Sequence, residues 1–172
     1  MTDFITGKEI PDIGAEANRQ AVARYLVNEK GYAKEDIALD VDIFFNIAGE
    51  YYQSQLDLVV SPDGGKTYLM VLKCPAGSLG SWERETLAAA RLLEKYQIPL
   101  TVISDGITAI VLDTVTGRKV GEGLNAIPSK KEALEILRVT TLRPLPEERI
   151  EQEKLIFRSY DSMRVNVKRN IS

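Results

Sequence analysis

The sequence predicts a single α/β domain with a mixed central sheet, helices on its flanks and a helical extension at the end. Three observations predict it. Helical periodicity precedes a group of strand-like segments, a second helix separates that group from later strands, and strand patterns stop at Pro128. We expect the core domain to span residues 1–128 and the helical extension residues 129–172.

The first half of the core is expected to form one helix and three strands. Apolar residues recur at helical spacing over residues 15–30, and Gly31 ends the pattern. Residues 37–45 alternate apolar and acidic side chains, which is typical of a half-buried strand. Two further strands, 52–61 and 67–74, flank the turn PDGG, whose residues favour a hairpin.

The second half alternates helix and strand before it becomes helical. An apolar stripe predicts a helix over 81–96, with Ser81 as its N-cap. Short apolar strands follow at 99–103 and 107–113. The last helices are expected from Ser129 to Val139 and from Glu147 to about Met163.

Composition excludes several kinds of chemistry. The 172 residues contain no histidine and only one cysteine, Cys74, so histidine bases, histidine-ligated zinc and a disulfide framework are excluded. A metal would be held by carboxylates and carbonyls, as Mg²⁺, Mn²⁺ and Ca²⁺ are. The net charge is −3, so nucleic-acid binding would need a local basic surface or a partner. Because no segment has the apolar length of a signal peptide or a membrane span, we expect a cytoplasmic protein.

The most informative segment is the hairpin QLDLVVSPDGGKTYLMVLKCP at residues 55–75. With its turn centred near Gly64, Asp57 is expected opposite Val71, and Gln55 opposite Lys73. Opposed residues and residues two apart share a face, so all four would line one face at one end of the hairpin.

An aspartate beside a lysine on stiff strands suits metal-assisted phosphodiester hydrolysis. Asp57 would bind Mg²⁺, a carbonyl near Leu72 would add an oxygen ligand, and Lys73 would orient the attacking water. The alternative is structural: Asp57 hydrogen-bonds neighbouring backbone, and Lys73 extends from the strand end to water.

The chain resembles the PD-(D/E)xK nuclease superfamily, most closely the N-terminal domain of the type I restriction enzyme R protein. The resemblance covers roughly residues 12–125. It rests on GAEANR at 14–19, LDLVV at 56–60, VLKCP at 71–75 and IPLTVISDG at 98–106. It implies a restriction-endonuclease-like fold, with Glu16 as the helix carboxylate, Asp57 as the metal-binding aspartate and Lys73 as the catalytic lysine.

The sequence departs from this family at Val71, where the usual Glu-x-Lys pair has its glutamate. The family's glutamine and tyrosine in the following helix are also not evident. In some relatives the second carboxylate has moved to that helix, which makes Glu83 and Glu85 candidates for the metal. The alternative is that both only stabilise the first turn of the helix.

These features leave two functions open. The first is a Mg²⁺- or Mn²⁺-dependent endonuclease, a hydrolase of DNA. The second is a catalytically inactive nucleic-acid- or protein-binding module that kept the fold. An apolar strip in the last helix also predicts that it packs on the domain, docks on a protein partner or pairs with a second copy; it comprises Ile150, Leu155, Ile156 and Met163.

Overall fold

The computed structural model describes residues 1–171, with side chains up to Met163; the final residue of the expected 129–172 extension lies outside the described residues. One sheet of six strands forms the centre, in the spatial order β1 to β6. The strands are Ile37–Ile47, Glu50–Val60, Met70–Lys73, Leu100–Ser104, Ala109–Asp113 and Lys119–Glu122. All neighbouring pairs are antiparallel except β3 and β4, which are parallel.

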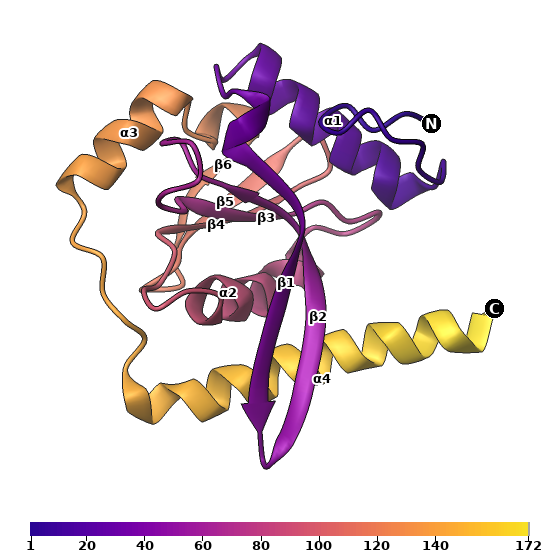
Figure 1. The fold of residues 1–172 in the computed structure, drawn as a ribbon, viewed down its shortest axis with the longest axis vertical. Coiled ribbons are helices and arrows are strands. Elements are labelled where there is room, and N and C mark those ends of the chain that lie inside the picture. Colours follow the sequence, from indigo (N-terminus) through magenta and orange to yellow (C-terminus); the bar gives the residue numbers. More distant parts are fainter. Residues whose placement is uncertain (172) are drawn as a thin grey trace.

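Four helices cover the two faces of this sheet (Figure 1). They are α1 (Gly14–Asn28), α2 (Glu83–Leu92), α3 (Lys130–Val139) and α4 (Glu147–Ile171). Helix α2 lies between β3 and β4 in the chain and makes the long connection that a parallel pair requires. The expected mixed α/β architecture with a terminal helix is confirmed, and it is consistent with a restriction-endonuclease-like fold.

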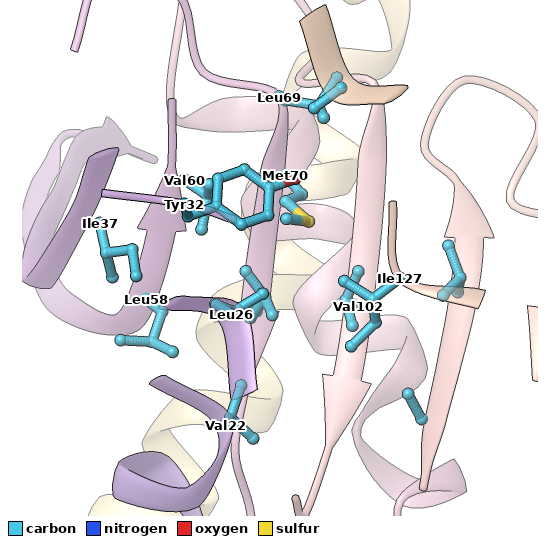
Figure 2. Close-up of a cluster of buried hydrophobic side chains, with 14 of the residues drawn as sticks. Val22, Leu26, Tyr32, Ile37, Leu58, Val60, Leu69, Met70, Val102 and Ile127 are labelled. Carbon is cyan, nitrogen blue, oxygen red and sulfur yellow. The ribbon is translucent and has the colours of Figure 1, made fainter. Parts of the chain in front are cut away.

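Two apolar clusters lie on opposite sides of the sheet. The first packs α1 and α3 against the strands through residues such as Leu26, Leu58 and Ala133. Figure 2 shows Leu26 and Leu58 within this cluster. The second joins α2 and α4 to the strands through Ala89 and Phe157. Most of the stabilising apolar burial is therefore divided between two layers of helices.

The β1–β2 ribbon is much longer than β3 and projects past it (Figure 1). Leu58 belongs to the first apolar cluster, whereas Leu56, two residues earlier on the same strand, belongs to the second. Residues two apart normally face the same way, so the ribbon turns over between them. This turn coincides with Asp40, which has a φ of +49°, an uncommon conformation for a residue other than glycine.

The register of the β2–β3 hairpin differs from the expected one by two residues. Leu58 pairs with Leu72 and Val59 with Val71, so Asp57 lies level with Lys73 rather than with Val71. The connecting loop is wider than a tight turn because the Asp63 carboxylate accepts hydrogen bonds from the Ser61 hydroxyl and from the backbone of residues 66 and 67. A shift of two preserves the strand face, so the expected grouping of side chains survives.

The start of α2 was also predicted incorrectly. A 3₁₀ turn, Gly80–Trp82, precedes the helix, and Trp82 occupies the N-cap position without a side-chain cap. The Ser81 hydroxyl donates to the carbonyl of Ser78 instead. By contrast, α3 begins within one residue of the expected Ser129, which caps the helix by accepting from the backbone N–H of Glu132 at 3.1 Å.

Candidate functional site

Asp57 and Lys73 lie side by side where β2 and β3 meet. The Lys73 Nζ atom is 3.4 Å from the Asp57 carboxylate, and both side chains are about one quarter exposed. The backbone N–H of Cys74 donates to Asp57 Oδ2 at 2.8 Å, which fixes the carboxylate against the strand. Lys73 Nζ also lies 4.3 Å from the centre of the Trp82 ring, a cation–π contact. The lysine is thus held between a carboxylate and an aromatic ring.

This pair opens into a cavity of about 660 Å³. Its lining comes from the β1–β2 ribbon, β3, α2 and α4. Among the described residues, the polar and charged side chains of the lining are those of Asp40, Gln53, Ser54, Gln55, Asp57, Lys73, Glu85, Thr86, Asp161 and Ser162. Leu56, Val71, Ala89 and Phe157 contribute apolar surface, with Tyr52 and Trp82 as aromatic lining.

The cavity is acidic. Its described lining includes four carboxylates, from Asp40, Asp57, Glu85 and Asp161, and one cationic side chain, that of Lys73. A low-dielectric cavity with this charge excess attracts cations and repels isolated anions. The electrostatics therefore favour a divalent cation over a phosphate group entering alone.

Glu16 reaches this region through Arg19. The Arg19 guanidinium is 2.5 Å from the Glu16 carboxylate and 2.8 Å from that of Asp40, and its side chain is only 8% exposed. Burial alone would lower the pKa of Arg19, but Glu16 and Asp40 raise it overall. Arg19 therefore stays charged and ties α1 to the kinked position of β1.

Asp40 is placed beside the Asp57–Lys73 pair by the ribbon itself. Its neighbours Leu39 and Val41 pair with Leu58 and Leu56, so Asp40 lies opposite Asp57. A positive φ in a residue other than glycine is costly and requires support from the surrounding structure. The ion pair with Arg19 supplies that support.

Helix α4 forms one wall of the cavity and is held there by polar contacts. The Tyr52 hydroxyl donates a short hydrogen bond to the Asp161 carboxylate, which also accepts from the Ser54 hydroxyl at 2.9 Å. Burial, and then the contact with Asp161, raises the pKa of Tyr52 to about 12. The tyrosine consequently remains a neutral donor at physiological pH.

A second anchor holds the first half of α4. The Glu153 carboxylate, 1% exposed, accepts from both Arg84 and Arg91 of α2 at 2.8–2.9 Å. Burial would raise the pKa of Glu153, but the two arginines lower it overall. Phe157, one helical turn later, packs edge-on against Phe45 and Tyr52. The apolar strip predicted in the last helix is therefore only partly buried against the domain, because Leu155 and Met163 remain exposed.

Cys74 follows Lys73 in the chain, and its buried thiol is unreactive. Burial is the main cause that raises the pKa of its thiol. The negative charges of Asp57 and Glu16 raise this pKa further, whereas the positive charges of Lys73 and Arg19 lower it. With 1% exposure and a place in the first apolar cluster, Cys74 is a small core residue.

The residues chosen from the sequence divide into two groups. Asp57, Leu72, Lys73 and Glu85 all line the cavity. Glu16 approaches it through Arg19, and Glu83 is not among the described lining residues. Asp40 and Asp161 were missed. The alternation of acids in residues 37–45 indicated a polar strand face, but nothing in the sequence indicated which acid would reach the cavity.

A divalent metal must be tested against this donor set. The described residues contain no group of three histidine, cysteine, aspartate or glutamate side chains placed to hold an ion. Mg²⁺ often uses only one or two carboxylates and keeps several waters. The acidic lining suits that arrangement, with Asp57, Glu85 and the Leu72 carbonyl as the donors on offer.

Comparison with known protein families gives a match. Residues 14–128 match the family described as the type I restriction enzyme R protein N terminus. The chain belongs to this family. Its matched segment runs from the first residue of α1 through β6, so it includes Asp57, Lys73 and the cavity wall from α2, whereas α4 lies beyond it. No curated protein and no solved structure shows significant similarity to the chain. Placement in the PD-(D/E)xK superfamily is consistent with this membership.

Among residues 1–171, no helix has both the length and the apolar composition needed to cross a membrane.

Proposed function

We propose that this domain hydrolyses DNA phosphodiester bonds with the help of Mg²⁺ or Mn²⁺, as an endonuclease whose second carboxylate comes from α2. The observation that supports this most is the Asp57–Lys73 pair in an acidic cavity that Glu85 also lines. Glu85 comes from the first turn of the helix that follows the lysine strand, so it enters the cavity from another backbone element than Val71.

Each residue has a role in this proposal. Asp57, Glu85 and the Leu72 carbonyl would hold the metal. When bound, the metal would neutralise charge at the phosphate and lower the pKa of the attacking water. Lys73 orients that water, and its cationic group opposes the charge that builds up on the phosphate. Glu16 acts at a distance by holding Arg19, and through it Asp40. Glu83 is the less suitable metal ligand because it does not join the described lining.

A second function is favoured by a different observation. Val71 is 1% exposed and packs in the apolar cluster between the sheet and α2. Asp57 already accepts a backbone hydrogen bond, and Lys73 is already paired with Asp57 and stacked on Trp82. These contacts also suit an inactive binding module for nucleic acid or protein.

Plasmid cleavage distinguishes the two functions. Supercoiled and linear DNA are incubated with Mg²⁺ or Mn²⁺ and the wild type, Lys73→Ala, Val71→Glu, Glu85→Gln or Glu83→Gln. The proposal expects wild-type cleavage, with losses of about 10²-fold or more in Lys73→Ala and Glu85→Gln. Glu83→Gln, the matched control on the same helical turn, should cleave like the wild type.

Titration calorimetry gives a test that does not depend on cleavage. The wild type should bind Mn²⁺, and Glu85→Gln should weaken that binding at least tenfold. If no variant binds metal and none cleaves DNA, the nuclease proposal fails. If only Val71→Glu cleaves, the inactive-module function is correct for the natural chain.

The setting of this activity is also a proposal. We infer a cytoplasmic protein that acts on DNA, with residues 1–128 as the core and residues 129–172 as an extension. A second copy of the chain, or another protein, would cover apolar side chains that α3 and α4 leave exposed, among them Val139, Leu155 and Met163. A light-scattering mass equal to one chain at every concentration would rule out the homodimer.

A further inference from the structure

Lys73 has two neighbours that attract its positive charge, and they differ in kind. Its Nζ atom lies 3.4 Å from the Asp57 carboxylate and 4.3 Å from the centre of the Trp82 ring. Asp57 is also a proposed metal ligand, whereas an indole ring attracts ammonium groups through its face and offers no oxygen to a metal. The two contacts of Lys73 therefore respond differently when Asp57 is occupied by a divalent cation.

The contact between Asp57 and Lys73 is the weaker attachment of this carboxylate. Asp57 Oδ2 accepts the backbone N–H of Cys74 at 2.8 Å, which fixes the carboxylate against the strand end. The distance of 3.4 Å to Lys73 exceeds the values of about 2.7–2.9 Å that are usual for charge-assisted hydrogen bonds. A divalent cation on the same carboxylate repels the ammonium, and in a partly buried site that repulsion is weakly screened. Lys73 is therefore the partner that leaves Asp57 first.

The backbone of Trp82 is fixed on both sides. Its N–H donates to the carbonyl of Leu79 at 3.1 Å, and its own carbonyl accepts from the Thr86 hydroxyl at 2.7 Å. Trp82 occupies the N-cap position of α2 without a side-chain cap, so its ring is not needed to begin the helix. The 3₁₀ turn Gly80–Trp82, which replaced the expected serine cap, thereby places an aromatic ring against Lys73.

The other carboxylates of the described lining are engaged elsewhere. Asp40 is paired with Arg19 at 2.8 Å, and Asp161 is held by two hydroxyl groups of β2. Glu85 is the second metal ligand in the proposed function. Within this lining, the ring of Trp82 is thus the group that still attracts the lysine after its own carboxylate partner has bound a cation.

We propose that Trp82 is a positioning residue, which keeps the Lys73 ammonium at the site when Asp57 is occupied by a divalent cation. This rests on the proposed function and deepens it. In the resting protein Lys73 is shared between Asp57 and Trp82, and in the metal-bound protein it stays on the ring. Lys73 thus remains close enough to orient the attacking water, and its pairing with Asp57 is the resting state of an active site.

Nuclear magnetic resonance measures the contact between Lys73 and Trp82 without any catalytic step. Protons above the face of an indole ring are shifted upfield, so the Cε protons of Lys73 should give an upfield signal in protein that carries isotope-labelled lysine. Lys73→Arg identifies this signal by its absence, and Trp82→Leu should return it to the ordinary position. Tyr51→Leu removes an exposed aromatic ring from the β1–β2 ribbon and is the control that should leave the signal unchanged.

Asp57→Asn tests the inference without any metal. The neutral amide no longer attracts the ammonium as a charged group, so the Lys73 signal should stay upfield or move further upfield. Mg²⁺, at a concentration that saturates the wild type in calorimetry, should likewise leave the signal upfield. A signal that returns to the ordinary position in either experiment would overturn the inference, because Lys73 would then have left the ring when it left its carboxylate.

Plasmid cleavage connects this position of Lys73 to the reaction. Trp82→Phe keeps an aromatic ring and should retain most of the wild-type rate, whereas Trp82→Leu should lose about tenfold. Equal rates for Trp82→Leu and the wild type would count against the inference. Urea unfolding checks that the variants fold, and if Trp82→Leu does not, the Lys73 signal of Asp57→Asn still decides.

The two proposals fail in different ways. An upfield Lys73 signal in Asp57→Asn, without cleavage by the wild type, would reject the nuclease proposal and leave the positioning of Lys73 by Trp82 in place. Wild-type cleavage together with loss of the upfield signal in Asp57→Asn would reject this inference alone.

Discussion

Two buried ion networks flank the cavity, and they differ in where they end. In the α2–α4 network, Glu153 lies between Arg84 and Arg91 and has 1% of its side chain exposed. In the α1–β1 network, Arg19 lies between Glu16 and Asp40, and the side chain of Asp40 is 58% exposed. The first network stays within α2 and α4, where Arg149 adds a longer contact to Glu153 at 3.8 Å, and we call it closed. The second, which we call open, ends on a carboxylate that lines the cavity. The difference teaches that similar buried charge pairs serve to join helices in one place and to present a functional group in the other.

The largest effect is expected from breaking the closed network. Glu153→Gln leaves two arginines without their buried counter-ion, which typically costs about 3–5 kcal/mol. Urea unfolding should show this loss, because both helices lose their polar attachment. Glu151→Gln, at an exposed position of the same helix, is the control and should stay within about 0.5 kcal/mol of the wild type. A loss below about 1 kcal/mol for Glu153→Gln would mean that Phe157 alone holds α4.

Breaking the open network should cost less stability and change the cavity more. Arg19→Met leaves Glu16 and Asp40 without their cation, with an expected loss of about 2–3 kcal/mol, because Asp40 can turn to solvent. Removing the positive charge makes the cavity more acidic, so Mn²⁺ affinity measured by calorimetry should rise several-fold. Arg24→Met, on the exposed side of the same helix, should leave that affinity unchanged. An unchanged affinity in Arg19→Met would show that this network is as purely structural as the other.

A smaller effect is expected at the contact where α4 meets the ribbon. Asp161→Asn weakens the hydrogen bonds from Tyr52 and Ser54, with an expected cost of about 1 kcal/mol. Loss of the carboxylate should also lower the pKa of Tyr52 from its value of about 12. Phenolate absorbance during an alkaline titration, compared with Tyr52→Phe, measures this shift. A Tyr52 pKa that does not move would assign the whole shift to burial.

The smallest effect is the part of the alkaline pH dependence of stability that Tyr52 contributes. The folded-state pKa of Tyr52 is raised above the ordinary value of 10. Its contribution is therefore complete below pH 10 and declines as pH rises from 10 toward 12, because the unfolded chain loses its proton first. The free energy of unfolding, measured by urea at each pH, should fall more steeply in the wild type than in Tyr52→Phe. Parallel curves would contradict the prediction.

The sequence predicted the fold well because local signals and topology agree in this chain. The strands of the β1–β2 ribbon follow an alternating pattern with a Gly49 turn, and Pro128 precedes the change to helices. The hairpin register was wrong because its loop depends on the side-chain contacts of Asp63, which spacing does not reveal. The N-cap of α2 was wrong because a 3₁₀ turn replaced the expected serine cap.

The site was predictable only in the part that depends on strand periodicity. A register shift by an even number of residues leaves Asp57 and Lys73 on the same face of the hairpin, so the sequence was enough to predict that they lie close together. Asp40 was not, because it reaches the cavity through a left-handed backbone position supported by Arg19. Asp161 was not, because its place depends on how α4 crosses the ribbon, more than one hundred positions along the chain from its partner Tyr52.

The buried thiol of Cys74 can report how often the structure around it opens locally. It is the sole cysteine and is 1% exposed; its side chain packs in the first apolar cluster, while its backbone N–H donates to Asp57. A thiol reagent can react there only during moments when the strand ends separate, so its labelling rate counts those openings. Ligands that bind at Asp57 and Lys73 should slow the labelling in proportion to their occupancy. The natural cysteine is sufficient for this measurement, so no engineered probe is needed.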